Sequence, residues 1–195
     1  MADRKSRPRK PVPRNPEETR AGLIDAAEAE FNAHGFHGTD SNRIARRAGF
    51  APQTFYRHYT DKTAIFLAVY ERWWKNESAA IGAILRARGR AGLGKVADTL
   101  IAFHAKWRGF RRSLRHLSVE DGRVRAARTH ARKAQIVTAK DLLPRLRRDE
   151  IAALLLILER LCDAAAEGEF IDMGFAKADA RKAVISALSA AYGPR

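Results

Sequence analysis

The stretch that decides the fold is DSNRIARRAGFAPQTFYRHY, which occupies residues 40–59. It predicts two short helices joined by a tight turn. The first helix runs over about residues 40–47, and Gly49 breaks the chain after it. Pro52, which suits the first position of a helix, begins the second, and this helix ends near His58. Two short helices around a glycine-containing turn are typical of a helix-turn-helix, a motif whose second helix enters the major groove of DNA.

The residues before this motif predict one more helix and a basic arm. Helical spacing begins at about Glu17, and Gly35 ends it. The apolar face of this helix consists of Leu23, Ile24, Ala27 and Phe31. Residues 1–16 combine basic side chains with a cluster of prolines, which prevents a helix. We expect a flexible basic arm there, which either reaches the DNA backbone or minor groove or acts only as a solubilising tail.

The residues after the motif continue the helical pattern. Asp61 caps a fourth helix, and a cluster of glycines over residues 89–94 interrupts the chain beyond it. Further helices are predicted at about 95–107, 110–119, 123–142, 149–167 and 177–192. No stretch alternates with a period of two over a sustained length, so the fold is expected to be all-α. The expected division is a helix-turn-helix domain over residues 17–62, with its motif at 40–59, and a helical domain over 63–195.

Composition excludes several classes of protein. With 195 residues, of which 46% are hydrophobic, the chain has enough apolar material for a real core. The longest wholly apolar run, Ile151–Leu158, is far shorter than the roughly 20 residues that cross a bilayer, and the first residues lack the apolar stretch of a secretory signal. A single cysteine, Cys162, excludes an intramolecular disulfide and a multi-cysteine zinc site. We therefore expect a protein of the reducing cytoplasm with no membrane contact.

The net charge of +15 implies a polyanionic partner or ligand. Basic residues concentrate in residues 108–148, whereas residues 149–195 are net acidic. Two helical faces carry the excess: Arg108, Arg111, Arg112 and Arg115 on one, and Arg125, Arg128 and Arg132 on the other. Three interpretations of these faces stay open, because guanidinium groups suit an anionic effector such as an organic acid, suit DNA phosphates, and also occur on faces that only meet solvent.

The helix-turn-helix segment resembles the TetR/AcrR family of bacterial transcriptional regulators over about residues 19–70. The resemblance is specific because several fixed spacings agree at once. The matching residues are Gly38-Thr39, Ile44-Ala45, Ala48-Gly49-Phe50, Thr54-Phe55-Tyr56, His58-Tyr59 and Lys62. It implies an N-terminal three-helix DNA-binding domain followed by a helical ligand-binding and dimerisation domain. It also implies a homodimer, usually a repressor, that a small-molecule effector releases from a palindromic operator. Where the family commonly has a capping serine, this chain has Ala51.

The DNA-binding residues are expected on the two short helices and beside them. Gln53 and Thr54 stand at the front of the recognition helix, where glutamine pairs with adenine and threonine touches a thymine methyl group. The resemblance assigns phosphate contacts to Tyr56, His58 and Lys62. The full set of expected DNA-binding residues is Thr39, Asn42, Arg43, Gln53, Thr54, Tyr56, Arg57, His58 and Lys62. For Tyr56, His58 and Lys62 a packed or merely solvated side chain is the alternative interpretation. For Arg57 the alternative to base reading is a phosphate contact.

The second half of the chain is expected to supply a pocket and a dimer interface. Aromatic residues with one histidine form the candidate pocket, although aromatics at helical spacing also build ordinary cores. These candidates are Phe66, Tyr70, Trp73, Phe103, His104, Trp107 and Phe110. Apolar stripes on the last two long helices are expected to pair across a two-fold axis, and the alternative is that they cover one monomeric core. The stripes include Leu154, Leu158, Leu161, Ala183, Ala187 and Leu188.

Three other classes of protein compete with a DNA-binding regulator. We find no catalytic motif and no metal-ligand spacing among the histidines, so we expect no enzyme, no catalytic residue, no cofactor and no metal ion. A sequence-nonspecific basic DNA-packaging protein is the more serious alternative, because net charge alone would permit it. A basic protein of membrane surfaces is disfavoured, since no helix combines a low-polarity face with flanking lysines. The effector, the operator and the regulated genes are not encoded in any recognisable pattern.

Overall fold

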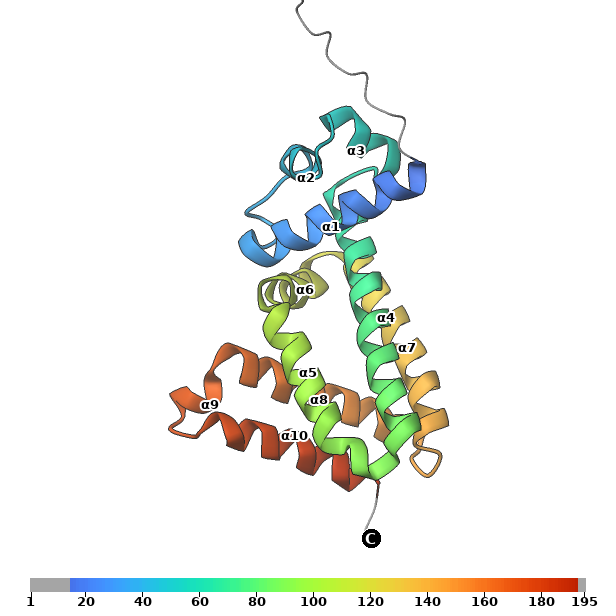
Figure 1. Cartoon of the computed structure of the whole chain (residues 1–195), viewed down its shortest axis with the longest axis vertical. Helices are drawn as coiled ribbons and strands as arrows, with labels where there is room; N and C mark the ends of the chain where they lie inside the picture. The colour runs from blue at the N-terminus through green and yellow to red at the C-terminus, as the bar shows by residue number, and fades with distance from the viewer. Residues whose placement is uncertain (1–14, 193–195) are drawn as a thin grey trace, which may run out of the picture.

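The computed structural model describes residues 15–192, and within that range it contains helices and turns but no strand (Figure 1). This confirms the all-α prediction. The helices are α1 Pro16–His34, α2 Ser41–Arg47, α3 Pro52–His58, α4 Lys62–Arg88, the 3₁₀ helix η1 Gly89–Gly92, α5 Leu93–Lys106, α6 Arg108–Glu120, α7 Gly122–Leu142, α8 Arg148–Glu167, α9 Glu169–Asp172 and α10 Lys177–Ala191. The predicted basic arm at 1–16 lies almost wholly outside the described residues. Within the described range, no helix is long and apolar enough to cross a bilayer.

Local signals explain the two short helices. Asp40 caps α2, because its side chain accepts a hydrogen bond of 2.8 Å from the Arg43 backbone N–H. Gly49 has a φ of +77°, a left-handed conformation that glycine adopts without strain, and it turns the chain between α2 and α3. Pro52 begins α3, whereas Ala51 offers no side-chain cap. Of the three helix starts in this domain, only that of α3 therefore lacks a side-chain cap, since Asn15 caps α1.

The N-terminal helices share one core with the helices that follow them. Phe31 of α1, Ile44 of α2 and Phe55 of α3 are fully buried in the same cluster as Phe66 of α4 and Phe110 of α6. Helices α1–α3 form one end of the molecule, and α4 runs from them toward the opposite end alongside α7 (Figure 1). Packing is therefore continuous across residue 62, where the sequence analysis placed a domain boundary. Helix α4 is therefore packed directly against the helices of the DNA-binding segment.

A second core lies at the other end of the molecule, between α5, α8 and α10. Helices α8 and α10 lie side by side and cover α5 (Figure 1). This core contains the apolar stripe that the sequence analysis assigned to a dimer. Leu158 and Leu188 are buried in it, Leu154, Leu161 and Ala187 pack against it, and Ala183 is half-buried. Within the monomer, Leu158 and Leu188 are therefore covered by neighbouring helices, whereas the other four residues stay partly exposed, and their assignment to a dimer interface remains a prediction.

Candidate nucleic-acid interface and internal cavity

The helix-turn-helix presents polar side chains on its outer surface and apolar ones inward. Ile44 and Phe55 are fully buried and hold α2 and α3 against α1. The opposite side exposes Asn42 and Arg43 of α2 and Gln53, Tyr56 and Arg57 of α3, and it leaves Thr54 and His58 half-exposed. Tyr56 is 57% exposed, unusual for so large an aromatic side chain. Seven of the nine predicted DNA-binding residues therefore lie on the two helices with their side chains exposed or partly exposed.

Lys62 and Thr39, the other two, make internal bonds. The Lys62 ammonium donates to the carbonyl oxygens of Phe36, at 2.7 Å, and Thr39, at 2.9 Å. Burial of this group lowers its pKa. The Thr39 side chain is buried, and its hydroxyl donates to Glu30 at 3.0 Å. Thr39 therefore has no free side chain for DNA, and Lys62, with three donors, keeps one for an outside acceptor. The Lys62 bonds join α4 to the turn between α1 and α2, and the Thr39 hydroxyl joins that turn to α1.

Glu30 of α1 organises the basic side chains of α2. It is 2% exposed, and its carboxylate lies 2.7 Å from Arg43 Nε and 3.1 Å from Arg47 Nη1. A carboxylate this deeply buried requires partners, and the two guanidinium groups and Thr39 supply them. The sequence analysis missed this residue. The available signal was an acidic side chain four residues from Ala26 on the buried face of α1, next to Phe31.

An internal cavity of about 130 Å³ lies between α4, α5, α7 and α8, with α10 closing one side. Three of the seven predicted pocket residues line it, namely Tyr70, Trp73 and His104. The other four do not. Phe66, Trp107 and Phe110 are buried in the first core, where the Phe66 and Phe110 rings stack at 4.6 Å, and Phe103 packs against the same core. This part of the expectation is corrected, because those rings fill the joint between the N-terminal helices and α6.

Most of the cavity wall is aliphatic, and one end is polar. The aliphatic wall comes from leucines, isoleucines and a valine of α4, α5 and α8, with single leucines from α6, α7 and α10, none of which the sequence analysis assigned to a pocket. At the polar end, Trp73 Nε1 and Glu77 Oε1 are buried and, among the described residues, have no hydrogen-bond partner. Glu77 Oε1 lies 3.5 Å from His104 Nε2. Buried donors and acceptors in native proteins normally find partners. These two atoms therefore mark where the cavity can receive a polar group.

Arginines from α6 and α7 are paired with carboxylates of α8, and two of them, Arg111 and Arg132, line the cavity. Arg111 donates to Asp163 at 2.6 and 3.0 Å and to Glu159 at 2.9 Å. Arg128 and Arg132 also bind Glu159. Arg112 and Arg115 bind Glu167. The interpretation of these faces as merely solvent-facing is wrong for Arg111, which is 2% exposed. An anionic effector would have to displace carboxylates that already occupy the guanidinium groups.

Asp163 is the centre of this network. Burial raises the pKa of its carboxyl group, but hydrogen bonds from His104 and Arg111 outweigh burial and hold the pKa far below its ordinary value. His104 Nδ1 lies 2.8 Å from Asp163 Oδ1, and Arg115 Nη1 lies 2.7 Å from Oδ2. The carboxylate therefore stays charged at neutral pH. Both its oxygens bind cationic or polar partners, so the charge of this buried carboxylate is matched by its neighbours.

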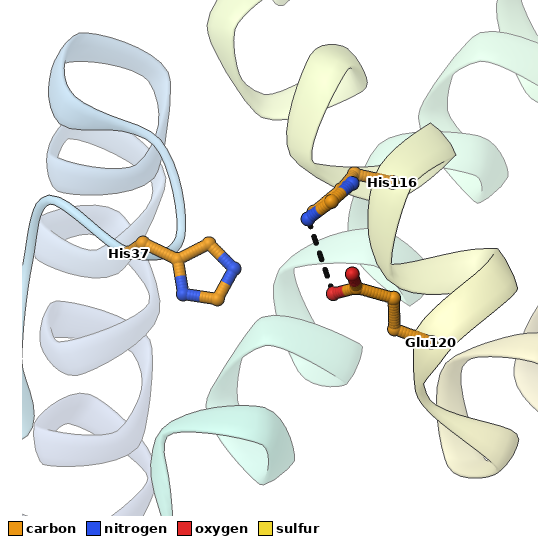
Figure 2. A group of neighbouring side chains, drawn as sticks. All are labelled: His37, His116 and Glu120. Carbon is orange, nitrogen blue, oxygen red and sulfur yellow. Dashed lines mark ion pairs between the residues drawn. The ribbon is translucent and has the colours of Figure 1, made fainter.

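A separate group of side chains lies where α6 meets the turn after α1. His116 and Glu120 are one helical turn apart on α6, and His37 extends toward them from that turn (Figure 2). All three are exposed. The sequence analysis found no metal-ligand spacing among the histidines. It overlooked the four-residue interval between His116 and Glu120, and His37 is too distant in sequence to be linked with them.

Comparisons with known proteins agree with this geometry. Residues 23–69 match the family model of the bacterial regulatory proteins of the tetR family. Over 59 residues, which are 30% of this chain, the sequence is 41% identical to the HTH-type transcriptional repressor SCO4008 of Streptomyces coelicolor. That match spans only 31% of the relative's own length.

Solved structures extend the likeness from this segment to the fold of the whole chain. A tetR-family transcriptional regulator from Streptomyces coelicolor superimposes with a TM-score of 0.68 at 18% identity, over 90% of this chain and 83% of that one. The fatty acid degradation regulator FadR from Bacillus halodurans gives a TM-score of 0.67 at 16% identity, over 92% and 96%. Identities this low show a shared fold. Residues 23–69 therefore resemble the DNA-binding segment of the tetR family of bacterial regulatory proteins, and the chain as a whole shares the fold of solved tetR-family regulators.

Proposed function

We propose that this protein is a homodimeric transcriptional repressor that binds a palindromic operator in the cytoplasm and leaves it when a small hydrophobic effector enters the cavity. The observation that carries the proposal is the outward face of α2 and α3. Gln53, Tyr56 and Arg57 are exposed on this face, whereas Ile44, Ala45 and Phe55 on the inward side are fully buried. A rigid helix with exposed Gln53, Tyr56 and Arg57 suits the major groove.

Dimerisation is supported by exposed apolar side chains at the opposite end of the molecule. Five of the eight exposed large apolar residues in the described part of the chain lie in α8, α9 and the turn after α9. They are Leu156, Ile157, Ile171, Met173 and Phe175. Apolar groups that gather on one exposed region mark interaction surfaces. A second copy that covers them would place two reading heads on one DNA face, as a palindromic operator requires.

The cavity supports an effector with an apolar body and a neutral polar end. An apolar cavity of about 150 Å³ holds a molecule the size of benzene, so 130 Å³ admits a slightly smaller body without movement. Trp73 Nε1 offers a donor and Glu77 Oε1 an acceptor. A hydroxyl group satisfies both, because it accepts one hydrogen bond and donates another. A carboxylate would instead meet Glu77 while the nearby guanidinium groups are already paired.

Release from the operator is explained by the position of α4, which contacts both the cavity and the helix-turn-helix segment. This helix lines the cavity with Tyr70, Trp73 and Glu77, and its first residue, Lys62, is bonded to the turn between α1 and α2. An effector larger than the empty cavity pushes α4 away from α7 and α8 and carries the reading head with it. The effector shifts the population only by its preference for the moved state over the DNA-bound one.

The DNA-binding proposal is tested by Gln53→Ala on a duplex obtained from a binding-site selection. Loss of a bidentate base contact costs about 1–3 kcal/mol, which is roughly 10–100-fold in affinity. The matched control is Asn76→Ala, which removes an exposed amide from α4, remote from α3. Fluorescence anisotropy measures both. Equal affinities of the two variants for the selected duplex would refute the assignment of Gln53 to base reading.

The effector proposal is tested by tryptophan fluorescence with matched probes. Primary alcohols of six to ten carbons are expected to bind and to lower operator affinity, whereas carboxylates of the same length are expected to bind at least tenfold more weakly. Glu77→Gln keeps the acceptor oxygen and removes the charge, so it is expected to narrow this difference between alcohol and carboxylate. Tighter binding of the carboxylates by the unaltered protein would contradict the proposed chemistry.

A further inference from the structure

Three side chains at the joint between the two ends of the molecule have the chemistry of a metal site. His116 Nε2 lies 3.1 Å from Glu120 Oε2 on α6, and the His37 ring lies edge-on to the His116 ring with centroids 5.8 Å apart (Figure 2). One potential ligand atom from each residue lies within 4.8 Å of the other two. Two imidazoles and a carboxylate are a donor set that binds zinc.

The geometry permits the side chains to close on an ion. Zinc bonds to nitrogen and oxygen ligands at about 2.0–2.2 Å, which places tetrahedral ligand atoms roughly 3.4 Å apart. The three ligand atoms lie at most 4.8 Å apart. No pair of them therefore has to move closer by more than about 1.4 Å to reach this spacing. Because all three side chains are exposed, rotation about their own side-chain torsions achieves this without disturbing the core. Exposure also leaves room for water as the fourth ligand.

We propose that His37, His116 and Glu120 bind one divalent transition-metal ion of the zinc type. The ion would join the turn between α1 and α2 to α6. Ser113 already links the same two segments, since its hydroxyl accepts a hydrogen bond of 2.9 Å from the Phe36 backbone N–H. The metal adds a second link, one helical turn further along α6. This site does not depend on the proposed repressor function, because it requires only that the N-terminal helices dock on α6 as the structure has them.

A zinc titration of the full chain, free of any purification tag, measures the site directly. A chromophoric chelator competes for Zn²⁺ at pH 7.5, and the unaltered protein is expected to bind one ion per chain. His37→Gln, His116→Gln and Glu120→Gln are each expected to weaken binding at least about tenfold. The control is His130→Gln, which removes an exposed histidine from α7 outside the group, and it is expected to bind as tightly as the unaltered chain.

Thermal unfolding provides a second readout of the link between the two segments. Zinc at about 100 times its Kd is expected to raise the Tm by roughly 5–10 °C in the unaltered chain and in His130→Gln. At the same zinc concentration the shift is expected to fall to about half or less in His37→Gln, whose circular dichroism without zinc is expected to match that of the unaltered chain. Full-affinity binding by His37→Gln would confine the ion to α6 and overturn the proposal. Absence of saturable binding by the unaltered chain would overturn it as well.

Discussion

Replacement of Arg111 by Met is expected to destabilise the protein far more than the same replacement of its neighbour Arg112. Arg111 is 2% exposed and makes three hydrogen bonds to Asp163 and Glu159. Removing one partner of a buried ion pair costs about 3–5 kcal/mol, because the other charge stays buried. Arg112 has a 58% exposed side chain and binds only Glu167, and exposed pairs contribute about 0–1 kcal/mol.

Thermal unfolding at pH 7 converts these energies into measurable shifts. For a chain of this size 1 kcal/mol corresponds to about 2–4 °C, so Arg111→Met is expected to lower the Tm by roughly 6–20 °C. Arg112→Met is expected to lower it by no more than about 4 °C. If Arg111→Met does not fold, Arg111→Lys keeps the charge and is expected to fall between the two. Equal losses for Arg111→Met and Arg112→Met would refute the conclusion that the buried network stabilises α6 against α8.

The pH dependence of the same comparison tests the role of Asp163. In the unaltered chain its pKa is far below the ordinary value, so its stabilising contribution is present above about pH 4 and is lost only as the pH falls toward the folded-state pKa. Without Arg111, burial is less opposed and the folded-state pKa rises. In the variant, Asp163 is then protonated at a higher pH than in the unaltered chain. Protonation removes the free-energy cost of a buried carboxylate that has lost its partner. The difference in Tm between Arg111→Met and the unaltered chain is therefore expected to shrink from pH 7 to pH 4.

Three further predictions concern the reading helix, the thiol and the dimer. Ala51→Ser supplies the missing cap of α3 and is expected to stabilise the protein by about 1 kcal/mol, or 2–4 °C in thermal unfolding; a lower Tm would contradict it. Burial raises the pKa of Cys162 to about 12, so the native thiol is expected not to react with Ellman's reagent at pH 8 and to react fully in guanidinium. Leu156→Asp together with Ile157→Asp is expected to convert the proposed dimer to a monomer in sedimentation velocity, whereas Val137→Asp, which changes an equally exposed residue of α7, is expected to leave the proposed dimer intact.

The short-range features of the fold were predictable because each rests on residues close together in the sequence. Pro52 and Gly49 predicted the start of α3 and the preceding turn, and the structure has both where they were expected. Helices α5 to α8 and α10 begin and end within about two residues of their predicted bounds, since apolar spacing and turn residues decide them. The short α9 was not predicted, because four residues are too few to show a period.

The long-range features were not predictable in the same way. The arginines of α6 formed a regular stripe in the sequence, but their partners Glu159 and Asp163 lie about fifty residues away on α8. Likewise, Lys62 looked like a surface cation until the fold placed it over the carbonyl oxygens of Phe36 and Thr39. Whether an apolar stripe faces the monomer core or a partner depends on which neighbours cover it. A single sequence shows that a helix has an apolar stripe, but it does not show which helix packs against that stripe.

The central claim, that this chain reads a DNA sequence, is tested most directly by a binding-site selection from randomised duplexes, followed by salt titrations on the selected duplex and on random DNA. Salt separates the two contributions, because phosphate attraction weakens with ionic strength for every sequence alike. We predict one palindromic site that binds at least about a thousandfold tighter than random DNA near physiological salt. Uniform binding of all sequences that disappears steeply with salt would contradict the claim and would identify the protein as a nonspecific DNA-packaging protein.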